Sequence, residues 1–529
     1  MRRFADLYAT LDRTSSTNAK VQALEGYYRS APPEDAAWAV HFLAGRRLLR
    51  LLPTKLLREW AMALTGVPPW LLDESYAAVG DLAETLALLL DGVPHDTAET
   101  DVPLHVWIEE RLEGLRALGP EAQRDAVVQW WRGLPTFERF ILNKLLTGEM
   151  RVGVSQTLVV RALANVAGTD TDVMSHRLMG QWAPSADAFR SLMAPEAGSD
   201  EPSRPYPFCL AYPLEQEVST LGVRDEWQVE WKWDGIRAQL IRRGGRTFLW
   251  SRGEEVITAR FPEVVAAAER LPDGHVLDGE VLAWDGDRPL PFARLQLRIG
   301  RQTLTRQALA QAPAAFMAYD LLEHEGADIR ALPLRERRAR LEATLASHAP
   351  ALKVSALVDE QDWPGLAALR EEARTRGVEG YMLKRLDSAY GTGRRKGDWW
   401  KWKVDPFSVD AVLVYAQAGN GRRATLFTDY TFALWKDGEL VPVAKAYSGL
   451  SNEEIEQVDR WVRAHTLEKF GPVRRVAPEL VFEIAFENVQ RSTRHKSGVA
   501  VRFPRIARWR QDKAPADADA IERLLALIQ

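Results

Sequence analysis

The segment Glu230-Trp231-Lys232-Trp233-Asp234-Gly235-Ile236-Arg237 places a carboxylate, an amine and a guanidinium close together in the chain. Apolar and polar residues alternate from 227 to 233, which is the pattern of a strand with one apolar face. Lys232 then shares the wetter face with Glu230, just before an Asp-Gly reversal. A lysine held on a rigid strand is well placed to act as a nucleophile. The alternative is an exposed lysine beside a hairpin turn, because Lys-x-Asp-Gly by itself is a common pattern.

Other segments place ionisable side chains on expected strands in the same manner. Any one of them could be charge that protects an edge strand from aggregation. Together, converging cations and carboxylates are what a nucleoside triphosphate and its Mg²⁺ require. The segments are Asp278 with Glu280, Lys401 with Lys403 backed by Trp400 and Trp402, Glu379 with Lys384 at the two ends of one strand, and Arg252 at the end of another.

Three stretches of the chain differ in their pattern of apolar and polar residues, and the elements expected in them must position these groups. Residues 1 to about 195 show helical spacing of apolar residues with Gly-Pro punctuation, and 194–207 has a linker composition. Residues 226–404 alternate short strands with helices, which predicts an α+β domain on antiparallel sheets. A second β-rich segment, 406–509, is compatible with a small barrel. The expected strands are 227–233, 236–241, 247–251, 275–284, 315–321, 380–384, 399–403, 411–416, 425–435 and 480–486, and the expected helices of the central domain are 263–270, 334–346 and 363–376.

Composition limits the class of protein. The chain has 529 residues, 46% of them hydrophobic and 27% charged, as in an ordinary globular protein. A single cysteine, Cys209, excludes disulfide frameworks and cysteine-based zinc sites and favours a reducing compartment. No secretory signal or membrane span is expected. The net charge of −4 means that any attraction to nucleic acid is local, and basic residues gather in 394–403 and 491–513.

In their order and rough spacing, these motifs resemble the nucleotidyltransferase motifs of ATP-dependent DNA ligases. The upstream segments Glu138-Arg139-Phe140 and 146–154 resemble the helical DNA-binding domain of such ligases. The tail 502–513 resembles the terminal motif of their OB domain. The motifs that carry the resemblance in the central region are 230–237, Ser251-Arg252-Gly253, Asp278-Gly279-Glu280, Ala318-Tyr319-Asp320-Leu321, 379–384 and 399–403.

The resemblance implies a multidomain fold. It has an all-α N-terminal DNA-binding domain with a linker (1–205), an α+β antiparallel-sheet nucleotidyltransferase domain of ATP-grasp-like ligase type (206–405), and a C-terminal β-barrel OB-fold (406–529). It also implies that the chain is an ATP-dependent DNA ligase. Such a ligase is expected to act as a monomer in DNA replication, repair and recombination. Such an enzyme seals nicks in duplex DNA through a lysine–AMP intermediate, with Mg²⁺, for which Mn²⁺ can substitute. The expected location is the bacterial cytoplasm, at the nucleoid, without membrane association.

The resemblance also assigns roles to single residues. Lys232 would carry AMP, Glu230 would read the adenine amino group, and Tyr319 would stack on adenine. The remaining ATP-binding residues would be Arg237, Arg252, Glu280, Lys384, Arg395, Lys401 and Lys403. Glu280 and Glu379 would hold the metal. The terminal motif would contribute Arg505, Arg510, Asp512 and Lys513, which close over ATP during the first step. Arg151 and Gly153 would contact the DNA backbone.

Alternative functions remain open at this point. A transferase that caps RNA with GMP shares the lysine motif and the OB domain, but the helical N-terminal segment and the Asp512-Lys513 ending disfavour it. A catalytically silent DNA-binding module would have no need of Lys232, Glu280, Lys401 and Lys403 together. An RNA ligase is a nearer alternative. Charging with GTP or ATP, and sealing of DNA or RNA strands, would separate these enzymes.

Overall fold

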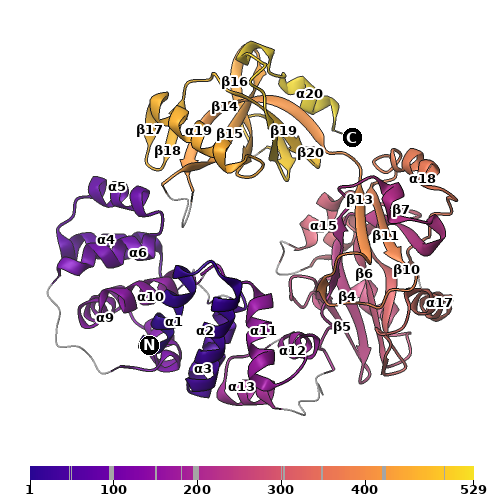
Figure 1. Cartoon of the computed structure of the whole chain (residues 1–529), viewed down its shortest axis with the longest axis horizontal. Coiled ribbons are helices and arrows are strands. Elements are labelled where there is room, and N and C mark those ends of the chain that lie inside the picture. Colours follow the sequence, from indigo (N-terminus) through magenta and orange to yellow (C-terminus); the bar gives the residue numbers. More distant parts are fainter. Residues whose placement is uncertain are drawn as a thin grey trace. The chain divides into compact units, whose positions relative to one another are not determined.

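The computed structural model of the chain is drawn in Figure 1. It describes residues 1–46, 48, 51–93, 101–148, 150, 152–179, 182–194, 202–299, 301, 304–346, 350–419, 425–493 and 495–528. The chain separates into two compact units. One consists of residues 1–23, 38–156 and 405–529, and the other of residues 24–37 and 157–404. No helix in these described ranges is both long and apolar enough to cross a bilayer.

The described part of the N-terminal region is helical, as the apolar spacing predicts. Helices start at or beside the prolines of the predicted punctuation, as α5 does at Pro69 and α9 at Pro120, because proline is accommodated in a first helical turn. The helices are α1 (Arg2–Arg13), α2 (Thr17–Ser30), α3 (Pro33–Leu43), α4 (Thr54–Thr65), α5 (Pro69–Val79), α6 (Leu82–Leu89), α7 (Leu104–Val106), the π-helix η2 (Trp107–Leu112), α8 (Glu113–Leu115), α9 (Pro120–Gly133), α10 (Thr136–Thr147), α11 (Gln156–Ala167), α12 (Thr171–Leu178) and α13 (Ala186–Met193).

Polar side chains join α10 to α6 inside the first unit. Arg139 is fully buried and donates to the carbonyl of Leu134 at 3.0 Å. Asn143 is also fully buried; it accepts from Trp131 Nε1 at 2.8 Å and donates to the Ala83 carbonyl at 3.1 Å. A buried polar group without such partners would cost about 1–3 kcal/mol. Arg139 Nη1 also donates to the Ala87 carbonyl of α6 at 3.4 Å, so Arg139 and Asn143 together join α10 to α6.

The central domain consists of two main sheets that lie in the second unit. A seven-stranded sheet has the order β10-β8-β6-β4-β5, with β7 on β6 and β9 on β8. A four-stranded sheet has the order β2-β13-β11-β3. The strands are β2 (Tyr212–Pro213), β3 (Trp227–Trp233), β4 (Ile236–Arg243), β5 (Arg246–Ser251), β6 (His275–Asp285), β7 (Arg288–Pro289), β8 (Ala314–His324), β9 (Ala327–Asp328), β10 (Leu352–Val354), β11 (Val378–Arg385) and β13 (Trp399–Lys403), while β1 (Cys209–Leu210) pairs with β12 (Gly393–Arg394).

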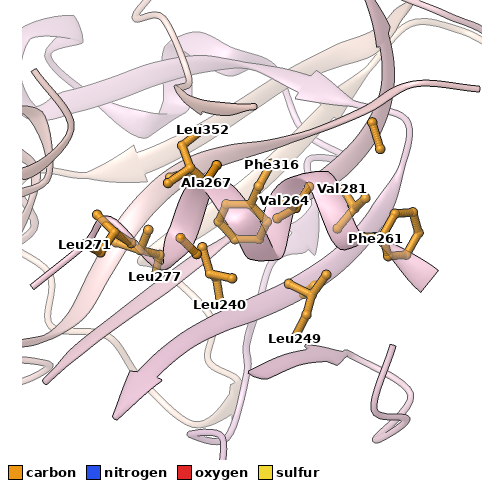
Figure 2. Close-up of a cluster of buried hydrophobic side chains, with 14 of the residues drawn as sticks. Leu240, Leu249, Phe261, Val264, Ala267, Leu271, Leu277, Val281, Phe316 and Leu352 are labelled. Atoms are coloured by element: carbon orange, nitrogen blue, oxygen red, sulfur yellow. The ribbon is translucent and has the colours of Figure 1, made fainter. Parts of the chain in front are cut away.

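Helix α14 (Pro262–Ala268) covers the seven-stranded sheet. Figure 2 shows Val264 and Ala267 beside Phe316 of β8 and Leu240 of β4. Complete burial of a leucine or phenylalanine side chain stabilises a fold by roughly 1.5–3 kcal/mol. Other helices of the domain are α15 (Phe292–Ile299), α16 (Arg306–Gln311), α17 (Leu334–Leu345) and α18 (Trp363–Arg370). The prediction of one helix over 363–376 is wrong beyond Arg370, where the chain continues in turns.

The Asp234-Gly235 turn does not close a hairpin. Strand β3 pairs with β11, whereas β4 pairs with β5 and β6, so the turn carries the chain from one sheet to the other. Gly235 leaves no room for a Cβ, which would meet the carbonyl oxygen of Val281 and the side chain of Glu280. The predicted wetter face of β3 is also wrong in part. Gln228 and Glu230 are buried, because this face is turned toward the seven-stranded sheet.

The described part of the C-terminal domain has a curled seven-stranded sheet, a two-stranded sheet (β20-β21) and the helices α19 and α20. The order of the larger sheet is β16-β15-β14-β18-β17, and β19 joins β14 to β22. The amide of Ile506 in β22 donates to the carbonyl of Ser448, just after β16, at 2.9 Å, which brings the two outer strands together as the predicted barrel requires. The elements are β14 (Phe407–Ala418), β15 (Phe427–Lys436), β16 (Glu439–Ala446), α19 (Asn452–Ala464), β17 (Thr466–Phe470), β18 (Val473–Val476), β19 (Val481–Phe486), β20 (Asn488–Arg491), β21 (Val499–Arg502), β22 (Arg505–Trp509) and α20 (Ile521–Ala526).

Candidate active site

Three adjacent strands of the four-stranded sheet bring the predicted lysines together. On β11, Met382 lies opposite Glu230 of β3 and opposite Lys401 of β13. Lys232 Nζ forms an ion pair with Glu379 Oε2, and Lys403 Nζ lies 3.3 Å from the same oxygen. Two predicted phosphate-binding cations, one predicted metal ligand and the predicted nucleophile therefore occupy one side of this sheet.

A bulge in β11 determines where Glu379 points. Strict alternation would place Glu379 on the face of Tyr381 and Leu383, which belong to the apolar cluster on the outer side of the sheet. The register of β11 against β3 shifts between Val378 and Tyr381. Gly380 adopts a φ of +119°, and a Cβ there would meet the carbonyl of Trp402. A β-bulge re-aims a side chain in this way, and here it turns Glu379 toward Lys232.

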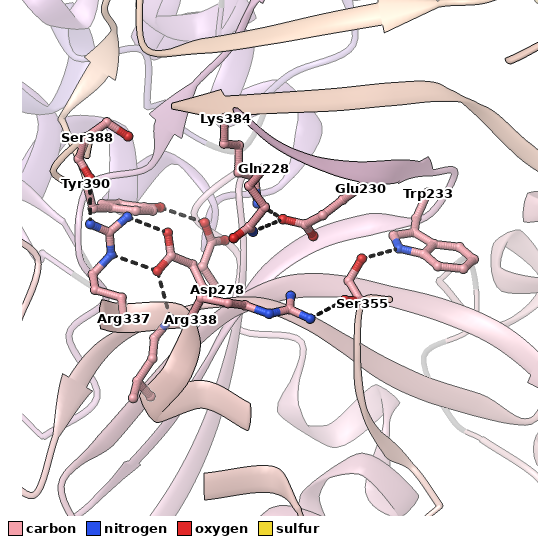
Figure 3. A network of polar contacts seen from close by, with 12 residues as sticks. Gln228, Glu230, Trp233, Asp278, Arg337, Arg338, Ser355, Lys384, Ser388 and Tyr390 are labelled. Atoms are coloured by element: carbon pink, nitrogen blue, oxygen red, sulfur yellow. Dashed lines mark hydrogen bonds and ion pairs between the residues drawn. The ribbon is translucent and has the colours of Figure 1, made fainter. Parts of the chain in front are cut away.

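Glu230 lies in a buried polar group beside this cluster. It is 1% exposed and its Oε1 accepts from Gln228 Nε2 at 2.6 Å and from Lys384 Nζ at 2.8 Å (Figure 3). Lys384 Nζ also lies 4.3 Å from the ring centroid of Tyr319, on β8 of the other sheet. Lys384 is therefore placed with Glu230 and Tyr319, and its ion pair is with Glu230.

Arg237 forms a second buried group across the seven-stranded sheet. Its Nη2 donates to Asp278 Oδ2 at 2.7 Å, and the hydroxyl of Tyr390 donates to the same oxygen at 2.8 Å (Figure 3 labels Asp278 and Tyr390). Arg252 follows β5, with its backbone amide donating to the Arg237 carbonyl at 2.8 Å and its side chain exposed. Register places Glu280 of β6 opposite Arg237. Arg237, which the sequence assigns to ATP binding, is thus held in place by its ion pair with Asp278.

The two predicted metal ligands differ in protonation. Burial raises the pKa of Glu280 to about 8, against the opposing charges of Lys232 and Arg237. Burial would also raise the pKa of Glu379, but the charges of Lys232 and Lys403 outweigh it and hold that pKa below its ordinary value. Burial, with Lys403 and Lys232 nearby, lowers the pKa of Lys401. Without a ligand near neutral pH, Glu379 is ionised and Glu280 is protonated.

The predicted residues Arg395 and Gly153 make other contacts. Arg395 Nη2 is 2.7 Å from Asp172 Oδ2 of α12, within the second unit, and both side chains are partly exposed. Arg151 lies outside the described residues. Gly153 has a φ of +64°, and its carbonyl accepts from Lys20 Nζ at 2.7 Å.

The terminal-motif residues lie in the C-terminal domain, and each is ion-paired within it. Arg505 pairs with Glu487 at 3.1 Å. Arg510 pairs with Asp512 at 2.7 Å and with Asp410 at 2.9 Å. Lys513 pairs with Asp410 at 2.6 Å.

The sequence assigns no role of their own to Gln228, Asp278 and Tyr390, which shape this site, or to Asp410, which pairs with Arg510 within the C-terminal domain. Gln228 has a weak sequence signal, because it shares the strand parity of Glu230. Asp278 stands out in the sequence beside Glu280, but its pairing with Arg237 does not. Tyr390 and Asp410 come from positions with no motif, so only tertiary contact identifies them.

The chemistry available here is phosphoryl transfer. A partly buried lysine can act as the nucleophile, neighbouring cations can neutralise phosphate oxygens, and carboxylates can hold a hydrated metal. Among the described residues, no group of three or more His, Cys, Asp or Glu could form a metal site. Glu280 and Glu379 are close enough for the charge of Glu379 to act on Glu280, and two carboxylates suit a magnesium ion that keeps water and substrate phosphate as its other ligands.

Comparison with known proteins decides the family. Residues 1–164 match the DNA ligase N terminus, 210–403 the ATP dependent DNA ligase domain, and 423–513 the ATP dependent DNA ligase C terminal region. A probable DNA ligase of Koribacter versatilis is 31% identical over 558 aligned residues, which cover 99% of this chain and 96% of that protein. The chain belongs to the ATP-dependent DNA ligases.

Other relatives agree. DNA ligase 1 of Korarchaeum cryptofilum is 30% identical, with 99% of this chain and 97% of that protein covered. The solved structure of Pmar-Lig_PreS3 shares the fold, with a TM-score of 0.61 and 17% identity over 96% of this chain and 99% of that chain. This ligase therefore joins DNA strands with ATP through an enzyme–AMP intermediate, which confirms the family and the activity expected from the sequence.

Proposed function

We propose that Lys232 is the residue that carries AMP. The observation that carries this proposal is the ion pair of Lys232 with Glu379, which also holds Lys403, beside Lys401 on the same side of the sheet. Lys232 Nζ first gives one proton to water and then, as the neutral amine, attacks the α-phosphorus of ATP; a P–N bond forms, and the bond to the bridging oxygen breaks. Pyrophosphate leaves, and a second proton of the amine passes to water.

The same cations serve the two later steps. An oxygen of the 5′-phosphate at a nick attacks the α-phosphorus of the lysine–AMP, and the P–N bond breaks. The 3′-hydroxyl then attacks the activated 5′-phosphorus, its proton passes to water, the phosphodiester forms and AMP leaves. Lys401 and Lys403 neutralise phosphate charge in these steps, since positioning and charge neutralisation dominate phosphoryl transfer.

The nucleoside is bound between the two sheets. Tyr319 stacks on adenine, and Glu230, held by Lys384 and Gln228, accepts from its amino group. Arg237, Arg252 and Arg395 contact ribose or phosphate. Arg237 is already ordered by Asp278. Arg395 must leave Asp172 to take part.

Glu280 and Glu379 are the residues that would hold Mg²⁺. A bound Mg²⁺ would neutralise charge on the triphosphate. Glu280 must lose its proton to bind a cation, so metal binding and proton release are linked at this residue. Mn²⁺ can replace Mg²⁺ at such oxygen ligands.

Nicked duplex DNA is the proposed substrate. The helical domain would bind phosphates without reading bases, because a ligase acts at any sequence, and Arg151 and Gly153 are the proposed contacts. Arg505, Arg510, Asp512 and Lys513 would act on ATP from the C-terminal domain.

We assign residues 1–205, 206–405 and 406–529 to the three domains of the chain. The protein would be a monomer that works at the bacterial nucleoid, in the cytoplasm.

Intact-mass analysis tests the proposal. The protein is incubated with Mg²⁺ and ATP, with GTP and NAD in parallel, and then with nicked all-DNA or RNA-containing duplexes. An AMP adduct from ATP alone, mapped to Lys232, and sealing of the DNA nick are expected. An adduct from GTP would instead favour a capping transferase, and sealing of RNA strands alone would favour an RNA ligase.

A further inference from the structure

One carboxylate in the C-terminal domain binds both terminal-motif cations. Asp410 Oδ2 accepts from Lys513 Nζ at 2.6 Å and from Arg510 Nη1 at 2.9 Å. The Arg510 guanidinium also donates Nε and Nη2 to Asp512, at 2.8 and 2.7 Å. The two cations are thus separated by a shared anion, and Arg510 is fixed on two sides.

Burial distinguishes this group from the other ion pairs of the motif. The side chain of Asp410 is 8% exposed and that of Arg510 is 14% exposed. Arg508, which pairs with Glu483 at 3.1 Å, is 61% exposed. Exposed pairs contribute little to stability, whereas removal of one partner of a buried pair costs several times more. Asp410 is therefore the carboxylate whose loss should disturb the motif most.

The backbone keeps Asp410 in place. Asp410 lies in β14 opposite Glu483 of β19, and Glu483 lies opposite Arg508 of β22. Its amide donates to Asp519 Oδ2 at 2.8 Å, and its carbonyl accepts from the amide of Asp519 at 2.8 Å. A side chain on a strand held at both backbone groups is a rigid reference point for the longer Arg510 and Lys513.

We propose that Asp410 is a positioning residue for the adenylation step, which it serves by holding Arg510 and Lys513 side by side. This inference rests on the proposed action of the terminal motif on ATP. Without the shared carboxylate, two like charges repel, and two long side chains regain rotamer freedom. The cations would then no longer be presented together to the triphosphate.

The test separates adenylation from sealing in the full-length protein. Asp410→Asn keeps the shape and removes the charge, and Asp410→Glu restores the charge on a longer side chain. Single-turnover formation of enzyme–AMP is measured against ATP concentration, and closure of a pre-adenylated nick is measured in parallel. For Asp410→Asn we expect adenylation to fall about tenfold, equivalent to ~1.4 kcal/mol, with sealing within about twofold of the unchanged protein. Asp410→Glu should recover part of the loss.

Asp459→Asn is the matched control. Asp459 lies in the same domain, has the same 8% side-chain exposure, and pairs with Arg463 at 2.7 Å without contacting the terminal motif. Equal adenylation defects in Asp410→Asn and Asp459→Asn would overturn the inference, because a general loss of stability would explain both.

Double substitutions supply the second readout. If Asp410 acts through the two cations, Asp410→Asn should add less than about twofold to the defect of Arg510→Ala with Lys513→Ala. A full additional tenfold loss would overturn the inference. Normal adenylation in the Arg510→Ala, Lys513→Ala protein would instead refute the proposed role of the terminal motif, and the role of Asp410 with it. Neither result changes the separate test of the nucleophile, which is the mapping of the AMP adduct to Lys232.

Discussion

The carboxylate of Glu379 accepts a hydrogen bond from Lys232, although alternation along β11 would turn Glu379 to the opposite face of that strand. The bulge around Gly380 makes this contact possible. The irregular backbone at Gly380 therefore places the Glu379 carboxylate beside the proposed nucleophile, and not against the apolar cluster on the other face of the sheet.

Substitution of Gly380 tests this relationship. Gly380→Ala places a methyl group against the carbonyl of Trp402 in a backbone conformation that alanine rarely adopts. We expect enzyme–AMP formation to fall more than about tenfold as Glu379 leaves Lys232. Gly222→Ala is the control, because Gly222 has a φ of +91° and nothing within 4 Å of a Cβ. Adenylation that is equally slow in both variants would show that backbone strain, and not the bulge, is responsible.

Lys232→Ala should remove the AMP adduct completely, while binding to nicked duplex persists. The side chain is at the surface of the cluster and is partly exposed, so its loss leaves no large cavity. Intact mass after incubation with ATP and Mg²⁺ measures the adduct, and a gel-shift titration measures DNA binding. The control is Lys353→Ala, because Lys353 lies on β10 over the ring of Trp284. This variant should form enzyme–AMP normally. Retained enzyme–AMP in the Lys232 variant would refute the central assignment.

Glu280 should make the ligand-free protein less stable as pH rises. Its folded pKa of about 8 exceeds its ordinary value of 4.5, so between these values the folded state holds a proton that the unfolded state has lost. The stability associated with protonated Glu280 is complete below about pH 4.5 and is lost as pH rises through 8. Glu280→Gln cannot titrate. Its gain in melting temperature over the unchanged protein should therefore be larger at pH 8.5 than at pH 5, and an equal gain at both would contradict the pKa.

The ion pair of Asp320 with Arg337 is a structural contact of the central domain. Both side chains are fully buried, with 2.8 Å from Nε to Oδ1 and 2.9 Å from Nη2 to Oδ2. Arg337→Met leaves a buried carboxylate unpaired and should lower the free energy of unfolding by ~3–5 kcal/mol in urea. Arg385→Met, which breaks an exposed pair with Asp387, should leave the free energy of unfolding nearly unchanged, because solvent screens such a pair. Asp320→Leu added to Arg337→Met should recover much of the loss; failure to recover would indicate that packing, not charge, dominates this position.

Local patterns were sufficient to predict much of this protein. The strands Trp227–Trp233 and Trp399–Lys403 have the predicted limits, because alternation of apolar and polar residues is a property of neighbouring positions. The helical N-terminal region follows from apolar spacing and proline positions for the same reason. The ordered motifs also identified the family, since their residue types and order can be read along the chain.

Contacts between distant segments decided the rest. Nothing local shows that the chain changes sheet at Gly235, that a bulge turns Glu379 to Lys232, or that Lys384 binds Glu230, 154 residues before it. The pairing of Asp410 with Arg510 spans 100 residues and has no motif at its first member. Pairing of strands, register and burial depend on the packing of whole sheets, so the sequence determined which groups could do chemistry, and the tertiary structure determined which of them meet.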